Sequence, residues 1–196
     1  MSVLSVYRAF RNKFVDALMV IAALVLVAHQ VSAARGDYAE QFRQIASTYT
    51  AEHNPTVQRY LSMVSNLHDV DLAAEVDALY ADQLYYSDTF LVASDRSEVL
   101  AHFQGLRDAG ATIDLTVHDM VASDSGIYLV WSADNTFEVL GRSTTAASIG
   151  VTMFMLDQQG KISVQQDFWD STQGFYQHLP VIGGALRTIR NEIASG

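Results

Sequence analysis

The chain has no cysteine and only two prolines among its 196 residues. Without cysteine it has no disulfide framework, no thiolate metal ligand and no cysteine nucleophile. Charged residues make up only 17% of the chain and hydrophobic residues 49%, a balance that excludes an intrinsically disordered protein. Basic residues are also few, because 12 lysines and arginines stand against 22 acidic residues and leave a net charge of −10. A globular surface this acidic repels phosphate backbones, so we expect no nucleic-acid partner.

One uncharged apolar run lies near the N-terminus, at residues 17–28 (ALMVIAALVLVA). Three basic residues precede it: Arg8, Arg11 and Lys13. Val31 and Ala33 occupy the minus-three and minus-one places of a signal-peptidase site. A run this short suits a signal peptide better than a membrane span, which needs about 20 residues. We expect residues 1–34 to be a cleaved signal peptide or, as the alternative, an uncleaved membrane anchor. The protein is then exported (periplasmic or extracellular) or anchored in the membrane.

Residues 35–196 read as one domain with helices first and strands later. Between residues 37 and 110, apolar side chains recur at spacings of three and four, which is typical of amphipathic helices. Four residues are candidate N-terminal caps of such helices: Asp37, Asn54, Asp71 and Asp95. A strand-like stretch at residues 84–86 interrupts the helices, and the last helix should end near Gly110.

After Gly110 the hydrophobic period changes from 3.6 to 2, which predicts β-strands. We expect strands over residues 113–118, 127–139, 150–156 and 161–169. Residues 141–148 are expected to form a loop and residues 157–160 a hairpin turn. An amphipathic segment follows Pro180. This order predicts an α+β fold with one antiparallel meander.

Four stretches carry a resemblance to a known family: YADQLYYSD (80–88), SDRSEVLAHF (94–103), FMLDQQGKI (154–162) and QDFWD (166–170). Together they resemble the SnoaL-like branch of the nuclear transport factor two-like superfamily, over roughly residues 72–178. The resemblance implies a cystatin-like α+β barrel, in which helices pack on a cone-shaped, curved antiparallel sheet and enclose a cavity. An N-terminal hydrophobic helix would precede this barrel.

The superfamily includes ketosteroid isomerases, limonene epoxide hydrolases, scytalone dehydratases and polyketide cyclases, and also members without known catalysis. The resemblance therefore does not decide the function. It further implies that the chain forms a homodimer.

Asp88 is the first candidate catalytic residue. By the resemblance it occupies the position of the general-base aspartate of ketosteroid isomerases, although Thr89 follows where the family usually has proline. A carboxylate there could take a proton from a carbon beside a carbonyl if an apolar cavity raised its pKa. The second acid of those isomerases falls on Thr152, whose hydroxyl is a weaker donor, and this argues against steroid isomerase chemistry. The alternative is that Asp88 only caps a turn at the end of its strand.

Asp167 and Trp169 share one face of the expected strand 161–169, because side chains alternate along a strand. If this face lines the cavity, burial beside the indole desolvates the Asp167 carboxylate and raises its pKa. The alternative is that Asp167 pairs with a base or faces water and that Asp170 caps the next helix. Ser171 or Thr172 could also cap that helix.

His118 and Asp119 are neighbours on a strand and point to opposite faces, so they cannot form a dyad with each other. Alternation places Asp119 on the apolar face with Ile113, Leu115 and Val117. There it is either a pocket acid or a sign that the strand ends or bulges. The same alternation turns His118 outward, where we expect it to be solvated.

Four side chains are candidates for binding a ligand in the cavity: Tyr86, Trp131, Thr152 and Trp169. The scattered histidines and carboxylates show no metal-ligand spacing, so we expect no metal site. The sequence has no nucleophile elbow, phosphate loop or dinucleotide fingerprint, so we expect no cofactor. The segment 185–193 places Arg187 and Arg190 near apolar residues. It could lie on a membrane surface, but packing on the barrel or on a second subunit is commoner.

Two hypotheses about function follow. In the first, the exported or tethered domain binds a small apolar molecule in its cavity, and the lack of an unambiguous catalytic constellation favours it. In the second, the protein is a lyase, isomerase or epoxide hydrolase with Asp88 as general base and Asp167 or Asp119 as its partner. A perturbed carboxylate in a closed pocket would favour this enzyme. A membrane-tethered interaction domain is a third possibility that depends on an uncleaved N-terminus.

Overall fold

The computed structural model describes residues 42–43, 54–139 and 141–195. The expected signal peptide or anchor lies outside these residues. So does most of the helix expected after Asp37, of which only Phe42 and Arg43 are described, both helical. Within the described part of the chain, no helix combines the length and the apolarity needed to cross a membrane.

Three helices begin at caps that the sequence predicts: α3 (Pro55–Ser65) after Asn54, α4 (Leu72–Leu79) after Asp71 and α5 (Arg96–Asp108) after Asp95. In each case the side-chain oxygen of the cap accepts hydrogen bonds from two backbone N–H groups of the first turn. These N–H groups have no partner inside the helix, so the caps fix where each helix starts. The chain leaves α5 through Gly110, whose φ of 71° favours glycine, as predicted.

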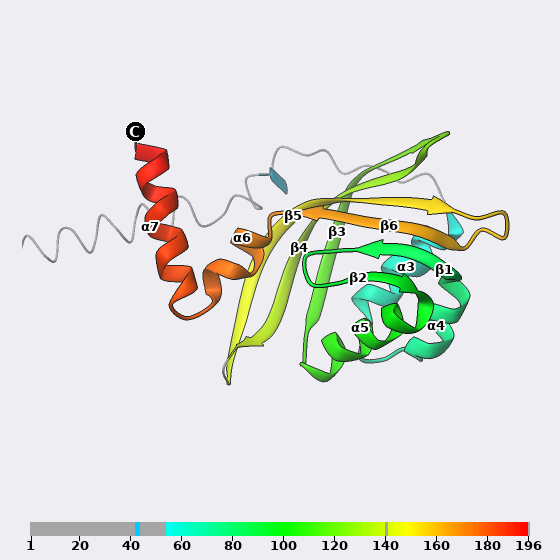
Figure 1. Cartoon of the computed structure of the whole chain (residues 1–196), viewed down its shortest axis with the longest axis horizontal. Helices are drawn as coiled ribbons and strands as arrows, with labels where there is room; N and C mark the ends of the chain where they lie inside the picture. Colours follow the sequence, from blue (N-terminus) through cyan, green and yellow to red (C-terminus); the bar gives the residue numbers. More distant parts are fainter. Residues whose placement is uncertain (1–41, 44–53, 140, 196) are drawn as a thin grey trace, which may run out of the picture. The chain divides into compact units, whose positions relative to one another are not determined.

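The six strands form one sheet in the order β2-β1-β6-β5-β4-β3 (Figure 1). Their bounds are β1 Tyr80–Ser87, β2 Val92–Asp95, β3 Thr112–Ser123, β4 Gly126–Val139, β5 Arg142–Leu156 and β6 Ile162–Trp169. All neighbours are antiparallel except β1 and β6, which are parallel. The expectation of a purely antiparallel sheet is therefore wrong for the pair β1 and β6. α5 and the meander β3–β5 intervene between β1 and β6, and they give the long crossover that a parallel pair needs.

The loop expected at residues 141–148 is also wrong, because all of these residues except Gly141 belong to the first half of β5. β5 pairs with β4 from Val139↔Arg142 to Ile127↔Phe154 without interruption. Polar side chains add cross-strand hydrogen bonds, such as that from Asn135 Nδ2 to Ser148 Oγ at 2.9 Å. The small polar residues of this segment carry little strand signal of their own, and the register with β4 decides their conformation.

Three short or exposed elements follow the sheet: α6 (Ser171–Gly174), the 3₁₀-helix η1 (Tyr176–His178) and α7 (Ile182–Ser195). Asp170 caps α6 by accepting a hydrogen bond from the Gln173 N–H. This confirms the alternative for Asp170, whereas Ser171 and Thr172 lie inside the helix. α7 begins after Pro180, where the sequence predicts an amphipathic segment.

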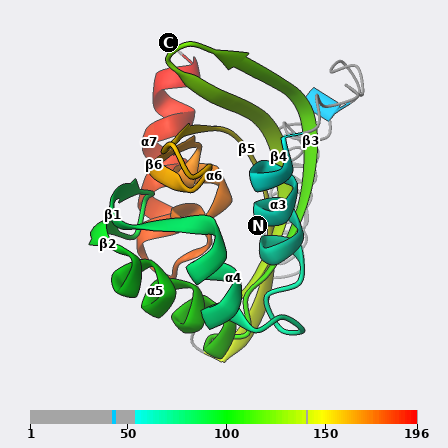
Figure 2. The same ribbon diagram turned by 90° about the vertical axis from the view of Figure 1, so that its right-hand side faces the viewer.

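The long strands curve around α3, α4 and α5, which pack on the concave face of the sheet (Figure 2). Between helices and sheet lies one hydrophobic core, and its fully buried members include Met63, Leu72, Val99, Leu129 and Phe154. The core does not fill the whole concave side. The space left between α3, α5, the long strands and the segment after β6 is the pocket described next.

Candidate functional site

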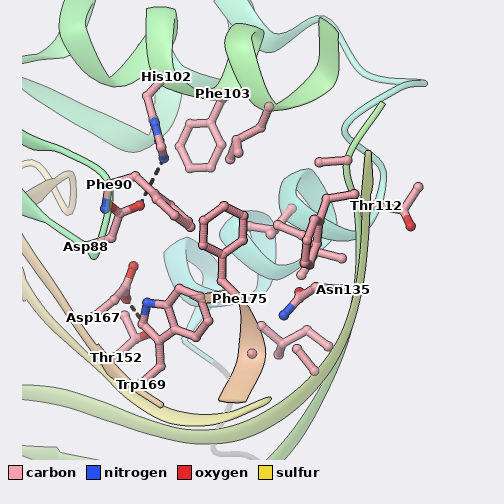
Figure 3. A pocket seen from close by; sticks show the side chains of 18 of the residues that line it. Asp88, Phe90, His102, Phe103, Thr112, Asn135, Thr152, Asp167, Trp169 and Phe175 are labelled. Atoms are coloured by element: carbon pink, nitrogen blue, oxygen red, sulfur yellow. Dashed lines mark hydrogen bonds and ion pairs between the residues drawn. The ribbon is translucent and has the colours of Figure 1, made fainter. Parts of the chain in front are cut away.

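A cavity of about 140 Å³ opens on the concave side of the sheet (Figure 3). Aromatic and aliphatic side chains form most of its wall, among them Phe90, Phe103, Leu115, Trp131, Phe137, Trp169 and Phe175. The polar groups are few: Asp88, His102, Asn135, Thr152 and Asp167, with some hydroxyls. In the part of the chain that the structure describes, no lysine or arginine lines this cavity. A mostly apolar cavity with a few converging polar groups is the usual form of a small-molecule site.

Asp167 lies on β6 with its side chain in the pocket wall. Its Oδ1 accepts a hydrogen bond from the Thr152 hydroxyl at 2.6 Å, and its Oδ2 accepts one from Gln165 Nε2 at 3.1 Å. Burial raises the pKa of Asp167 to about 6, although these two hydrogen bonds act in the opposite direction. Burial is the largest cause of this shift, in the direction expected if this face of β6 lines the cavity. A carboxyl group with this pKa can hold or release a proton near neutral pH.

The two groups that bind Asp167 are themselves fixed by hydrogen bonds. Trp131 Nε1 donates to Thr152 Oγ1 at 2.9 Å, so the Thr152 proton points to Asp167. Gln165 is fully buried and accepts a hydrogen bond from the Tyr80 hydroxyl at 2.7 Å, which turns its amide nitrogen toward Asp167. The carboxyl group is therefore held in one orientation by a preformed network.

Asp88 lies at the end of β1 and caps the following turn. Its Oδ1 accepts hydrogen bonds from the backbone N–H groups of Phe90 at 2.6 Å and Leu91 at 2.7 Å. Its Oδ2 accepts one from the Tyr86 hydroxyl at 3.0 Å and lies 3.0 Å from His102 Nε2. Burial favours the neutral form, but His102 and the two backbone N–H groups outweigh it and lower the pKa of Asp88. Asp88 therefore caps a turn, as in the alternative, and also lines the pocket.

His102 projects from α5 to the same carboxylate (Figure 3). Its Nε2 is buried and has no hydrogen-bond acceptor in good alignment among the described residues, although Asp88 Oδ2 is only 3.0 Å away. The imidazole and the carboxylate are therefore in contact without a well-aligned hydrogen bond between them. This contact places the imidazole beside Asp88, whereas among the described residues Asp167 has no such partner.

The pKa values of the two carboxyl groups in this pocket are therefore shifted in opposite directions, down for Asp88 and up for Asp167 (Figure 3). The negative charge of Asp88 contributes to the raised pKa of Asp167. One group stays ionised beside its histidine, while the other is ready to carry a proton. Pairs of acids with separated pKa values are typical of sites that perform acid–base chemistry, although structural networks produce them as well.

Two glycines leave the space that the two tryptophan side chains of the pocket occupy. A Cβ atom on Gly150 would lie 2.5 Å from the Trp131 ring, and one on Gly174 would lie 2.6 Å from the Trp169 ring. Trp169 also packs on Phe90, with ring centroids 5.9 Å apart, and so joins the wall to the turn that Asp88 caps. Each indole packs directly on the backbone of a glycine, and a larger residue at either glycine would displace the indole.

Six of the seven residues predicted for the site lie around this cavity: Tyr86, Asp88, Trp131, Thr152, Asp167 and Trp169. Asp119 does not line it, because a bulge between Val117 and Asp119 breaks the alternation that placed it there. His118 lies on the other face, as predicted, but it is buried rather than solvated. Its Nε2 lies 2.8 Å from Ser132 Oγ, and the Phe42 ring covers it.

Sequence reasoning missed His102 and Gln165. His102 follows Val99 by three residues, on the helix face that also carries Phe103, so helical spacing could have placed it toward the core. Gln165 shares the period-2 face of β6 with Asp167 and Trp169. Both signals are present in the sequence, but neither tells a core residue from a site residue.

In the described part of the chain, no three His, Asp or Glu side chains come together where they could hold a metal ion. The site consists instead of two carboxyl groups, one imidazole and a hydrogen-bonded threonine in an apolar wall. These groups can bind an oxygen atom of a ligand and can transfer protons to or from it.

Two solved structures from Shewanella species resemble this fold, and both carry the name SnoaL-like polyketide cyclase. The one from S. putrefaciens has a TM-score of 0.51 at 13% identity, over 62% of this chain and 84% of that chain. The one from S. denitrificans has a TM-score of 0.51 at 15% identity, over 61% and 94%. An LEH-like epoxide hydrolase from M. tuberculosis aligns with a TM-score of 0.47 at 18% identity, over 72% and 94%. Identities this low concern the fold alone.

No curated protein matches the sequence. The family model for the SnoaL-like domain matches residues 57–165, which is more than half of the chain and includes β1 to β5 and most of the site. The helices α3–α5, the mixed sheet and the pocket between them all fall in or next to this range. The chain belongs to the SnoaL-like domain family, with the nuclear transport factor two-like fold.

Proposed function

We propose that the pocket binds a small, largely apolar molecule that carries an oxygen function, and that Asp167 is the group that meets this oxygen. The observation that supports the proposal is the half-buried Asp167, whose pKa is raised to about 6 in a mostly apolar wall. Among the described residues, no basic side chain forms an ion pair with Asp167, and its polar contacts are the hydrogen bonds from Thr152 and Gln165.

The size and the wall of the cavity support an apolar ligand. Its volume of about 140 Å³ is close to that of engineered apolar cavities of about 150 Å³ that bind benzene. Aromatic rings surround the space, and they favour the flat or cyclic body of a small molecule. Each Asp167 oxygen accepts a single hydrogen bond, so each keeps a lone pair for the ligand.

An enzyme of the lyase, isomerase or epoxide-hydrolase kind is the second candidate, and the separated pKa values of the two acids favour it. In that case we assign proton transfer to Asp167 rather than to Asp88. Both Asp88 oxygens are already engaged, and its lowered pKa makes it a weak base. Asp88 would instead hold the His102 imidazole in place.

Binding of two simple probes as a function of pH tests the proposal. Cyclohexanone can only accept a hydrogen bond, so it should bind when Asp167 is protonated, and its affinity should fall above pH 6. Phenol can donate a hydrogen bond, so its affinity should rise above pH 6. NMR titration of the pocket amides measures both. Asp167→Asn should abolish both slopes, whereas Asp119→Asn, outside the pocket, should leave them unchanged. Two probes with the same pH dependence would contradict the role of Asp167.

The enzyme candidate needs a separate measurement. Exchange of the α-protons of cyclohexanone in D₂O, followed by NMR, reports proton transfer beside a carbonyl. We expect an acceleration that Asp167→Asn removes and Asp119→Asn preserves. Pocket binding without any such acceleration would favour the binding domain over a proton-transferring enzyme.

A further inference from the structure

A second cavity, of about 510 Å³, lies between the start of β5 and the segment that leads into α7. We call it the basic groove and define it by six of its lining residues: Arg142, Thr144, His178, Val181, Gly184 and Arg187. The remaining lining residues are Gln177, Leu179 and Pro180. None of these residues lines the apolar pocket of the preceding sections.

The charge of the groove is opposite to that of the chain. Two guanidinium groups and an imidazole line it, and no carboxylate does so among the described residues, although the chain carries 22 acidic residues and a net charge of −10. Four other described arginines are paired with carboxylates: Arg43, Arg59, Arg96 and Arg107. Arg142 has no such partner in the described chain, and Arg187 donates only to the Gln177 carbonyl oxygen at 2.6 Å.

The backbone adds donors at the same place. Gly184 lies in the first turn of α7, a helix of 14 residues, and the N-terminal end of a helix attracts negative charge. Its neighbours Gly183 and Ala185 donate to preceding carbonyl oxygens, but the Gly184 N–H has no acceptor among the described residues. A Cβ atom on Gly184 would meet nothing within 4 Å, so the space above this N–H is open.

The backbone at the rim of the groove is strained. Val181 has a φ of 67° and is 90% exposed. A β-branched residue rarely adopts this conformation, and backbone strain of this kind collects at ligand sites. Because the Val181 side chain is exposed, its packing does not offset this strain. The positive φ of Val181 follows instead from the turn that the backbone makes around the groove into α7.

We propose that the basic groove binds the oxyanion group of a small molecule, a phosphate or a carboxylate. Arg142 and Arg187 supply charged donors, Thr144 a hydroxyl and Gly184 a backbone N–H. Guanidinium groups match the planar geometry of such oxygens and bind them with strong, charge-assisted hydrogen bonds. This binding site is separate from the apolar pocket and does not depend on the function proposed for it.

The test is an NMR titration of the full chain with sodium phosphate and with sodium acetate, at constant ionic strength set by sodium chloride. We expect saturable shifts of the Gly184 amide and of the Arg142 and Arg187 side chains. Arg142→Gln should weaken binding about tenfold, the typical effect of losing one charge-assisted hydrogen bond. Arg107→Gln, which makes the same change of charge on α5, should have no effect.

A second pair of variants tests the groove without altering its charge. Gly184→Leu should fill the open space and abolish binding. Gly105→Leu, at an exposed helical glycine whose Cβ position is equally open, should not. Co-sedimentation with phosphatidylglycerol vesicles, against phosphatidylcholine vesicles, distinguishes a lipid headgroup from a free ion as the source of the oxyanion.

Vesicle binding that Arg142→Gln removes would support the groove and assign its ligand to a lipid phosphate. NMR shifts that do not saturate with phosphate or acetate would overturn the proposal. So would an equal loss of binding in Arg142→Gln and in Arg107→Gln. Binding that survives Gly184→Leu would overturn it as well.

Discussion

At the scale of the residue, burial of one carboxyl group sets a pH dependence that can be measured. The pKa of Asp167 is raised to about 6 in the folded chain, whereas it is close to 4 in the unfolded chain. The unfolded state therefore loses this proton first as the pH rises. The contribution of Asp167 to stability falls between pH 4 and pH 6 and stays lower above that range. The shift corresponds to about 3 kcal/mol.

Asp167→Asn removes this titration and tests its sign. The free energy of unfolding of the variant, minus that of the wild type, should rise by up to about 3 kcal/mol from pH 4 to pH 7. Urea unfolding at a series of pH values measures the difference. Asp119→Asn, a carboxylate outside the pocket, should give a difference without this rise. A flat curve for both variants would mean that Asp167 titrates normally.

Gly150 gives a second prediction at this scale. A methyl group there would lie 2.5 Å from the Trp131 ring and 2.8 Å from the Phe168 carbonyl oxygen. Gly150→Ala should therefore destabilise the fold by about 1–3 kcal/mol, as overpacking does. It should also weaken probe binding in the pocket. Gly105→Ala, in open space on α5, should instead stabilise it by about 0.5–1 kcal/mol. Thermal unfolding of both variants gives the contrast.

The sequence predicts the members of the site better than their environment. The resemblance and the alternation of β6 place Asp88, Thr152 and Asp167 correctly around the cavity. Neither could show that His102 pairs with Asp88, since that contact joins a helix to a strand end. The prediction for Asp119 is wrong because a one-residue bulge turns every following side chain of the strand to the opposite face of the sheet. Bulges leave no clear mark in the sequence.

At the scale of the element, helix starts are local and could be read from single residues. Asn54 caps α3, which contributes Tyr60 and Val64 to the pocket wall. Asn54→Ala should lower the free energy of unfolding by about 1 kcal/mol, because two first-turn N–H groups lose their acceptor. Asn54→Asp keeps an acceptor at this position and should be close to neutral. Chemical unfolding at pH 7 compares the two, and equal losses would contradict a capping role.

Strand pairing is not local, and here the sequence was a weaker guide. Residues 142–148 form part of β5 because β4 offers a matching register, not because their side chains favour a strand. The parallel contact between β1 and β6 joins residues about eighty positions apart, as in Tyr85↔Val164. Hydrophobic periodicity gives the faces of such strands, but it does not tell which strands become neighbours.

At the scale of the whole molecule, the sequence predicts an N-terminal segment that exports this acidic domain or anchors it in a membrane. Residues 1–33 contain three of the 12 basic residues and one of the 22 acidic ones, so cleavage after Ala33 leaves a net charge of −12. A more acidic chain without cysteine is suited to an oxidising compartment, in which no thiol has to be protected. The apolar run of residues 17–28 is shorter than the about 20 residues that a membrane-spanning helix needs, and this favours cleavage over anchoring.

Intact mass spectrometry of the protein from its own host tests export, with soluble and membrane fractions measured separately. We expect the main species to begin at Ala34. Ala33→Leu should block cleavage, because signal peptidase needs a small residue immediately before the cut. Ser32→Leu, at the neighbouring position where side chains are tolerated, should be cleaved normally. A full-length mass in the membrane fraction for the wild type would instead establish an anchor. The pocket and the basic groove would then work at a membrane surface, which phosphatidylglycerol vesicles reproduce.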